Sequence, residues 1–116
     1  MKVDIKGPGK RLRIYIGEQD RYRGKPFYEA MVYRLREERI AGATVIRGIE
    51  GFGAGSHVIH TTNLLRFSTD LPILLEVVDN AEEIEKAGTI IKEMLEEAKC
   101  GMLMTVEDIE ILHYSP

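Results

Sequence analysis

Three stretches of the chain have the hydrophobic pattern of β-strands. In residues 11–18, leucine and isoleucine occupy every second position, with Arg13 and Tyr15 between them, and this two-residue period is typical of a strand with one buried face. Residues 43–50 alternate in the same way. Residues 72–79 are almost continuously apolar, which predicts a central strand buried on both faces.

Two longer stretches have the 3.6-residue period of an amphipathic helix. Pro26 suits the first turn of the first helix, which is expected to extend to about Arg39. Asn80 and Glu83 resemble a capping box at the start of the second helix, which is expected to extend to about Ala98. The apolar stripes of the two helices are Tyr28, Met31, Val32 and Leu35, and Ile84, Ala87, Ile91, Met94, Leu95 and Ala98.

The remaining elements complete a known arrangement. Short strands are expected at 102–105 and 109–114, and residues 1–10 are expected to form an N-terminal lead-in. The order β-α-β-β-α-β with an extra C-terminal strand predicts an α+β fold, a ferredoxin-like sandwich with two helices on one face of an antiparallel sheet. With 116 residues, the chain is expected to form a single domain over 1–116.

The face of this sheet opposite the helices needs a cover. Tyr15, Ile46, Leu74 and Val78 would be half exposed there in a monomer. A patch of this kind is typical of an interaction surface, so the sequence predicts self-association.

Composition and charge exclude several classes of partner. The net charge of −3 lacks the basic character of a protein that binds nucleic acid or an anionic membrane. No apolar run approaches the roughly 20 residues of a membrane span, so direct membrane insertion is not expected. Cys100 is the single cysteine and cannot form an internal disulfide, which is typical of the reducing cytoplasm.

A glycine-rich segment follows the strand at 43–50. Gly51, Gly53 and Gly55 come in close succession, with Phe52 between the first two. Glycine lets a ligand approach the backbone closely, and successive N–H groups can hold a phosphate. The segment is neither a Walker loop nor a dinucleotide fingerprint, and a flexible hairpin connection explains its spacing equally well.

Motifs along the chain resemble two related families. Those that resemble the PII signalling proteins are Gly42-Ala-Thr-Val, Gly51-Phe-Gly, Leu71-Pro and Val106-Glu-Asp. Those that resemble a PII-like family, domain of unknown function 190 or UPF0166-type protein, are residues 12–18, 24–29, 42–53 and 68–72. The second resemblance covers nearly the whole chain.

The resemblance implies a signalling protein that forms a homotrimer and binds an adenine nucleotide in clefts between subunits. The residues it assigns to this ligand are Thr44 for the adenine, Gly51, Phe52 and Gly53 for the ribose and phosphates, and Val77 and Val78 for backbone contacts to the base. Some family members are associated with fluoride channels, which implies a membrane transport protein or channel as partner. The loop from Gly51 to Asn63 would contact that partner.

The chain departs from the PII pattern where phosphates bind. The PII Gly-Asp-Gly-Lys segment corresponds to a segment beginning at Lys99, and two PII arginines correspond to Ile111 and His113. Because each charge-assisted hydrogen bond contributes about 1.5–3 kcal/mol, we expect AMP to be favoured, with ADP and ATP as further candidates. Arg47 and Arg13 are candidate substitute cations.

A metal site and an interaction module remain as alternatives. His57 and His60, with Glu50 or Asp70, offer ligand types that zinc or nickel accepts, although two histidines on a polar loop are more often solvated. In the interaction module, the loop would regulate a membrane transporter without any nucleotide.

An enzymatic function is not expected. The sequence offers no Ser/His/Asp set, and Cys100 has no base placed beside it. Glu18 and Asp20 could be read as a pair of carboxylates, but a solvated loop explains them equally well.

Overall fold

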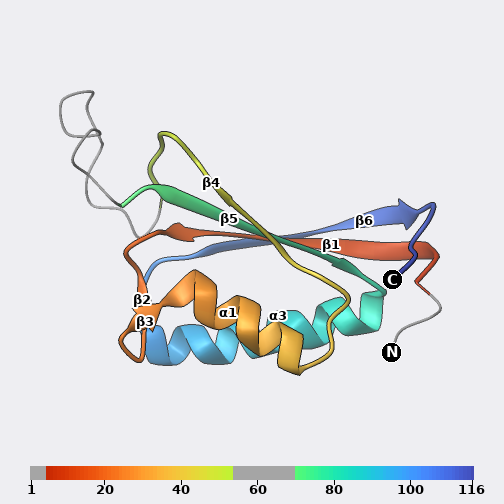
Figure 1. The fold of residues 1–116 in the computed structure, drawn as a ribbon, viewed down its shortest axis with the longest axis horizontal. Helices are drawn as coiled ribbons and strands as arrows, with labels where there is room; N and C mark the ends of the chain where they lie inside the picture. Colours follow the sequence, from red (N-terminus) through yellow and green to blue (C-terminus); the bar gives the residue numbers. More distant parts are fainter. Residues whose placement is uncertain (1–4, 54–69) are drawn as a thin grey trace.

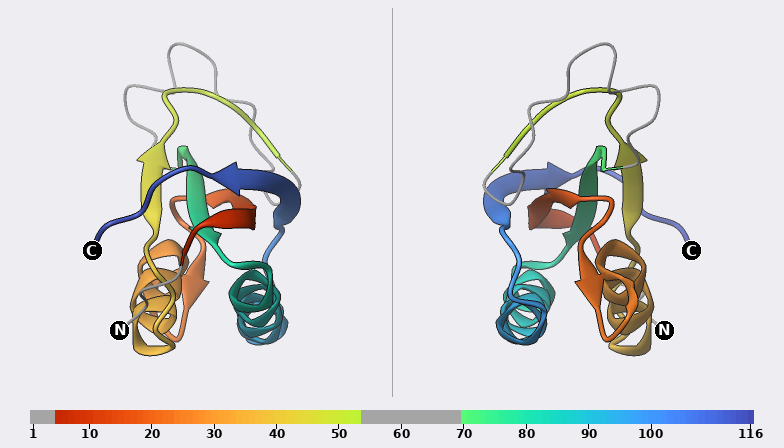
Figure 2. Two further views of the ribbon diagram at one scale, coloured as in Figure 1. Left: turned by 90° about the vertical axis from the view of Figure 1, so that its right-hand side faces the viewer. Right: turned by 90° about the vertical axis from the view of Figure 1, so that its left-hand side faces the viewer.

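The computed structural model describes residues 5–53 and 70–116. Its elements are β1 (Gly7–Gly17), β2 (Arg21–Tyr22), β3 (Lys25–Pro26), α1 (Phe27–Glu37), β4 (Thr44–Arg47), β5 (Pro72–Asp79), α3 (Ala81–Ala98) and β6 (Leu103–Ile111). Four strands form an antiparallel sheet in the order β4-β5-β1-β6. Both helices cover the same face of this sheet (Figure 1, Figure 2). This is the predicted α+β, ferredoxin-like arrangement.

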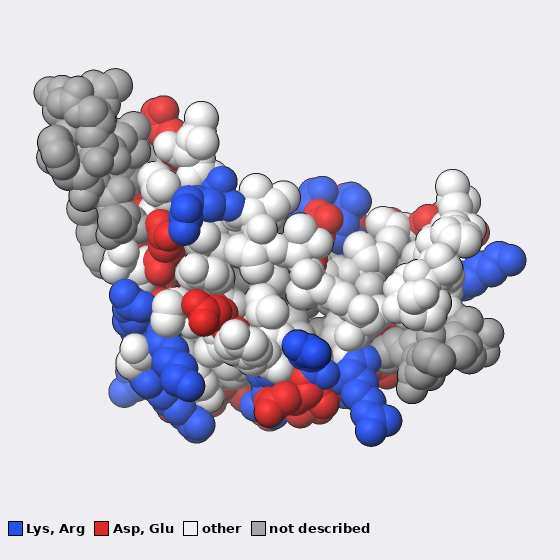
Figure 3. All heavy atoms as spheres, in the orientation of Figure 1, with Lys and Arg blue, Asp and Glu red and all other residues white. Residues whose placement is uncertain are grey.

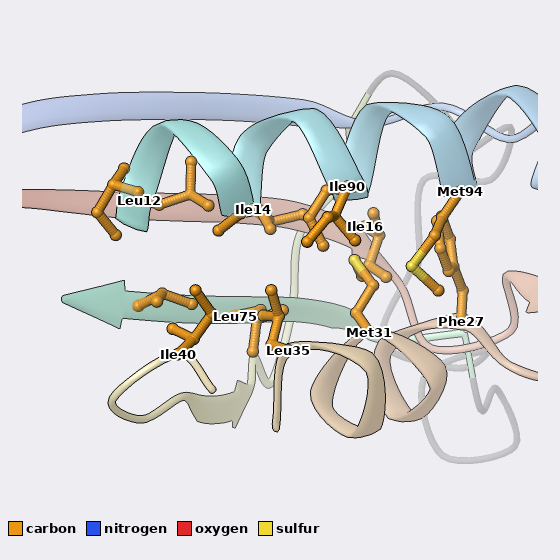
Figure 4. Packing of buried hydrophobic residues seen from close by; sticks show 14 of the residues in the cluster. Leu12, Ile14, Ile16, Phe27, Met31, Leu35, Ile40, Leu75, Ile90 and Met94 are labelled. Atoms are coloured by element: carbon orange, nitrogen blue, oxygen red, sulfur yellow. The ribbon is translucent and has the colours of Figure 1, made fainter. Parts of the chain in front are cut away.

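The core lies between the sheet and the two helices. On β1, Leu12, Ile14 and Ile16 are buried against the helices, as their alternation predicted. Side chains from α1 and α3, among them Met31, Leu35, Ile90 and Met94, pack onto them from the other layer (Figure 4). Removing this apolar surface from water, at about 25 cal/mol per Å², is the main force that holds the layers together.

Strand β5 is central in the sheet but is buried on one face only. Ile73, Leu75 and Val77 are buried, whereas Leu74 and Val78 are half-buried. The prediction of burial on both faces is therefore wrong for a single chain, because no element of the described chain covers the outer face of the sheet.

The two helices occupy the predicted stretches, but the side chain of Asn80 does not make its half of the predicted capping box. Asn80 takes the N-cap position of α3 and makes no side-chain capping hydrogen bond. At the other end, Lys99 adopts a left-handed conformation (φ 56°), and its N–H donates to the carbonyl of Leu95 at 2.8 Å. This is a common way for a helix to end.

Pairing with β1 alters two predicted boundaries. Strand β6 pairs with β1 continuously, from the register pair Gly7–Ile111 to the pair Tyr15–Leu103. The two short strands predicted at 102–105 and 109–114 are therefore one strand, and the extra C-terminal strand is its second half. For the same reason, residues 7–10 belong to the sheet rather than to a lead-in.

The segment between β1 and α1 contains a small hairpin. Strands β2 and β3 pair, and the two residues between them, Arg23 and Gly24, have φ values of 52° and 79°. Positive φ at both central residues is the signature of a tight I′ turn. Basic side chains gather over this hairpin at the lower left of Figure 3.

The outer face of the sheet exposes apolar side chains, as predicted. Tyr15 is 40% exposed and Ile46 51%. They lie beside a network in which Arg13 pairs with Glu76 at 2.9 Å and with Glu107 at 3.3 Å. Among the described residues, no helix has the length and hydropathy needed to cross a membrane.

Candidate functional site

The edge of the sheet at β4 holds the residues predicted to contact a base. Thr44 is exposed at the start of β4 and lies opposite Glu76 of β5. Val77 and Val78 follow Glu76, beyond the last register pair with β4. The side chain of Val77 is buried in the core, so this residue can offer only its backbone to a ligand. The structure thus brings Thr44, Val77 and Val78 together at one position on the sheet edge.

The glycine segment begins at the other end of β4. The N–H of Gly48 donates to the carbonyl of Pro72 at 2.7 Å, and a Cβ on Gly48 would lie 2.7 Å from Cγ of Pro72. A Cβ on Gly51 would lie 3.3 Å from the same atom. Glycine at these positions therefore lets the chain pack directly on Pro72.

The residues after this contact point away from the core. Ile49 is 89% exposed and Phe52 is 74% exposed. A Cβ on Gly53 would meet no atom within 4 Å. In the described part of the chain, Gly51, Phe52 and Gly53 thus present backbone and an aromatic ring to the surroundings, and Gly55 lies outside the described residues.

Hydrogen bonds and an ion pair connect the ends of β1 and β4 and the start of β5. The N–H of Glu18, after β1, donates to the carbonyl of Leu71 at 2.8 Å. The N–H of Gln19 donates to Oδ1 of Asp70 at 3.2 Å. Nη2 of Arg47, the last residue of β4, lies 2.5 Å from Oε2 of Glu18. The sequence offered no signal for these contacts beyond the presence of charged residues at strand ends.

The carboxylates of Glu18 and Asp20 do not act as a pair. Glu18 is bound to Arg47, while Oδ2 of Asp20 accepts from the N–H of Gly17 at 2.8 Å. Burial raises the pKa of Asp20, the hydrogen bond from Gly17 lowers it, and the nearby charge of Asp70 raises it further. The two carboxylates therefore have different partners and different environments.

The thiol of Cys100 is in an unfavourable place for a nucleophile. Burial, and then the negative charge of Asp20, raise the pKa of Cys100 to about 11. Reactive cysteines have lowered pKa values, because the thiolate is the reactive form. The environment of Cys100 therefore does not favour a role as a nucleophile.

The candidate cations lie in different parts of the fold. Arg13 is held on the outer face of the sheet by Glu76 and Glu107, whereas Arg47 lies at the end of β4, just before the glycine segment. Ile111 is buried at the far end of β6. Nearby, Nε2 of His113 lies 3.1 Å from Oγ of Ser115. Of the two predicted substitutes, Arg47 is therefore the one beside the glycines.

The proposed metal ligands His57 and His60 lie outside the described residues. Within residues 5–53 and 70–116, no group of three or more histidine, cysteine and acidic side chains is arranged to hold a metal ion. Asp70, a candidate third ligand, instead accepts a hydrogen bond from the N–H of Gln19.

The fold and sequence are similar to those of known proteins. Among solved structures, CPII, a nitrogen regulatory PII-like protein from Thiomonas intermedia K12 bound to ADP, AMP and bicarbonate, superposes with a TM-score of 0.63 at 20% identity, covering 91% of this chain and 90% of CPII. A phage SAM lyase in complex with S-methyl-5′-thioadenosine superposes with a TM-score of 0.52 at 13% identity, covering 98% of this chain and 92% of the lyase. At these identities the likeness shows a shared fold.

Sequence relatives are closer. A UPF0166 protein of Aquifex aeolicus (strain VF5) is 36% identical over 104 residues, which cover 90% of this chain and 93% of the relative. A UPF0166 protein of Methanocaldococcus jannaschii is 31% identical over 102 residues, which cover 88% and 90%. Residues 9–111 match the family DUF190, described as "Uncharacterized ACR, COG1993". The chain therefore belongs to the DUF190 family, and its fold is that of the PII-like proteins.

Proposed function

We propose that residues 1–116 form a single PII-like domain that acts as a homotrimeric cytoplasmic regulator and binds an adenine nucleotide. The observation that carries this proposal is the sheet edge where exposed Thr44 lies opposite Glu76, the residue that precedes Val77 and Val78. A hydroxyl and strand carbonyls are the groups that can bond the edge of an adenine base. CPII, which has the same fold, binds ADP and AMP, and this supports the choice of ligand.

The proposed site has two parts, at opposite ends of β4. Thr44, Val77 and Val78 would hold the base, while Gly51, Phe52 and Gly53 would line the ribose and phosphates. Strand β4 has 4 residues, from Thr44 to Arg47, so its ends are about 10 Å apart. Because the glycines lie beyond that end, we propose that base and phosphates contact different chains, in clefts between subunits.

The cations of the described chain favour a ligand with few phosphates. Lys99 is exposed at the end of α3, and the positions of the two PII arginines hold Ile111 and His113. A triphosphate needs several charge-assisted hydrogen bonds to offset the loss of its hydration. We therefore propose AMP as the preferred nucleotide, ahead of ADP and ATP.

The proposed output of the regulator is a contact with a partner through the loop from Gly51 to Asn63, of which residues 54–63 lie outside the described residues. The partner that we propose is a membrane transport protein or channel.

Isothermal titration calorimetry with AMP, ADP, ATP and cyclic AMP, with and without Mg²⁺, tests the nucleotide proposal. We expect binding to be tightest for AMP. Thr44→Val removes one hydrogen bond, and the expected loss is about two- to tenfold in affinity. The matched control is Thr89→Val on α3, whose hydroxyl donates to the carbonyl of Glu85 at 3.1 Å and which is expected to leave affinity unchanged.

A glycine substitution tests the phosphate half of the site. Gly53→Val meets no atom of the described chain at its Cβ, so folding should be preserved while the side chain obstructs the ligand. Gly88→Val on α3 is the control, because its Cβ is equally unobstructed and it lies outside the proposed site. If none of the nucleotides binds the wild-type protein, the nucleotide proposal is wrong.

A second candidate function is an interaction module that binds its partner without nucleotide. The observation that favours it is the exposure of Ile49 and Phe52 at the start of the loop. In this case Phe52→Ala would weaken partner binding equally in the presence and absence of AMP.

A further inference from the structure

The ion pair between Arg47 and Glu18 lies at the end of β4, a few residues before the glycine segment. Arg47 ends β4, and its Nη2 is 2.5 Å from Oε2 of Glu18. Figure 3 shows basic and acidic atoms beside one another at the upper left, over the end of β4. The contact joins residues far apart in the sequence and at the ends of two different strands.

The two partners differ in their access to solvent. The side chain of Glu18 is 16% exposed, whereas that of Arg47 is 56% exposed. A guanidinium has five N–H donors in a planar fork, so Arg47 can engage Glu18 and still offer donors to the surroundings. Glu18 is also anchored through its backbone, since its N–H donates to the carbonyl of Leu71. Glu18 is therefore the more buried partner, and Arg47 is the one that solvent or a ligand can reach.

We propose that Arg47 is the phosphate-binding cation of the nucleotide site and that Glu18 is a built-in competitor for it. This inference rests on the proposed function, because it names the charge that would meet the phosphates held at Gly51 to Gly53. Arginine suits the role because its fork binds phosphate oxygens in a bidentate manner. A phosphate that binds must draw the guanidinium away from Glu18 or share it.

Competition by Glu18 limits the affinity of the site. When the guanidinium turns to the phosphate, the mostly buried carboxylate loses its partner, and an unpaired charge in such a position is unfavourable. Asp70 and Asp20 lie nearby and add negative charge. The backbone N–H of Glu18 also donates to Leu71, which precedes β5, so the ion pair lies where the ends of β1 and β4 meet the start of β5.

The inference predicts opposite effects for the two halves of the pair. Arg47→Gln removes the cation, so affinity should fall by about ten- to hundredfold for ADP, by less for AMP, and not at all for adenosine. Glu18→Gln removes the competitor and keeps a similar shape, so affinity for ADP and AMP should rise. A pair with only a structural role would weaken all three ligands in both variants.

The experiment is calorimetric titration of wild type, Arg47→Gln, Arg47→Lys and Glu18→Gln with adenosine, AMP, ADP and inorganic pyrophosphate. Arg34→Gln and Glu38→Gln are the controls, because they break another arginine–glutamate ion pair, on α1, with 3.1 Å between Nε and Oε2 and side chains 38% and 35% exposed. Arg47→Lys keeps the charge without the fork and should recover part of the lost affinity. Thermal denaturation confirms that each variant is folded.

Each outcome separates this inference from the proposed function. If neither Arg47→Gln nor Glu18→Gln alters the affinity for nucleotides, the inference is overturned but the nucleotide site stands. The same holds if the variants weaken the binding of adenosine and ADP equally. If adenosine and nucleotides do not bind at all, the proposed function fails. In that case, titration with pyrophosphate decides whether Arg47 forms an anion site. Binding of pyrophosphate to Glu18→Gln but not to Arg47→Gln supports the site. If pyrophosphate does not bind to Glu18→Gln, the site is rejected.

Discussion

Among single residues, Asp79 shows how one buried charge can join two parts of the fold. Its side chain is fully buried at the end of β5. Oδ2 accepts from the N–H of Ala41 at 3.0 Å, and Oδ1 accepts from the N–H of Asn80 at 2.7 Å. Asp79 thereby fixes the connection between α1 and β4 against the start of α3.

Asp79→Ala should lower the free energy of unfolding by about 2 kcal/mol. Its loss leaves two N–H groups without their acceptor, and an unsatisfied buried donor costs about 1–3 kcal/mol. The measurement is urea denaturation followed by circular dichroism. Asp108→Ala is the control: this side chain is 88% exposed and pairs with Lys10, so its removal should change stability by no more than about 0.5 kcal/mol. Equal losses for the two variants would contradict the role of Asp79.

The reactivity of Cys100 should follow its environment. With a pKa raised to about 11, the thiolate fraction at pH 8 is about a hundredfold below that of an ordinary cysteine thiol. Alkylation by iodoacetamide should be correspondingly slow at pH 8, rise up to pH 11, and become fast in urea. Fast alkylation of the folded protein at pH 8 would show that the thiol is not held as described.

At the scale of elements, glycine has opposite effects in α3 and in the β2–β3 hairpin. Gly88 lies within α3, and a Cβ there would meet no atom within 4 Å. Gly88→Ala should therefore raise the free energy of unfolding by about 0.8–1 kcal/mol, the difference in helix propensity.

Gly24 has a φ of 79° in the hairpin turn, a conformation that alanine adopts poorly, so Gly24→Ala should be destabilising. Thermal denaturation of Gly88→Ala and Gly24→Ala measures whether each variant is more or less stable than the wild type. Stabilisation by Gly24→Ala would contradict the I′ turn.

In the whole molecule, the outer face of the sheet exposes apolar side chains such as Tyr15 and Ile46. The homotrimer that we propose would bury this face. Tyr15→Glu places a charge in the proposed interface and should convert the trimer to monomers, as measured by size-exclusion chromatography with light scattering. Tyr33→Glu is the control, because Tyr33 is 60% exposed and lies on α1, on the opposite layer. A wild-type monomer would reject the trimer, and a Tyr15→Glu trimer would exclude this face as its interface.

The elements with a local hydrophobic pattern could be predicted from the sequence. Alternation over 12–16 predicted the buried side of β1, and the 3.6-residue period predicted both helices, because burial of one face imposes its period on the chain. The order of these elements was sufficient for the ferredoxin-like fold. Motifs such as Gly51-Phe-Gly also led to the DUF190 family, which the match over residues 9–111 confirms.

The tertiary structure alone decided the features that depend on partners distant in the sequence. Strand β6 is continuous because β1 pairs along its whole length, and no local signal in 102–114 shows that partner. Likewise, Glu18 acquires a role only because the fold brings the ends of β1 and β4 together. Periodicity reports which side of an element is buried, whereas the identity of the neighbour depends on long-range packing. For this reason the elements were predictable, and the Arg47–Glu18 pair beside the proposed nucleotide site was not.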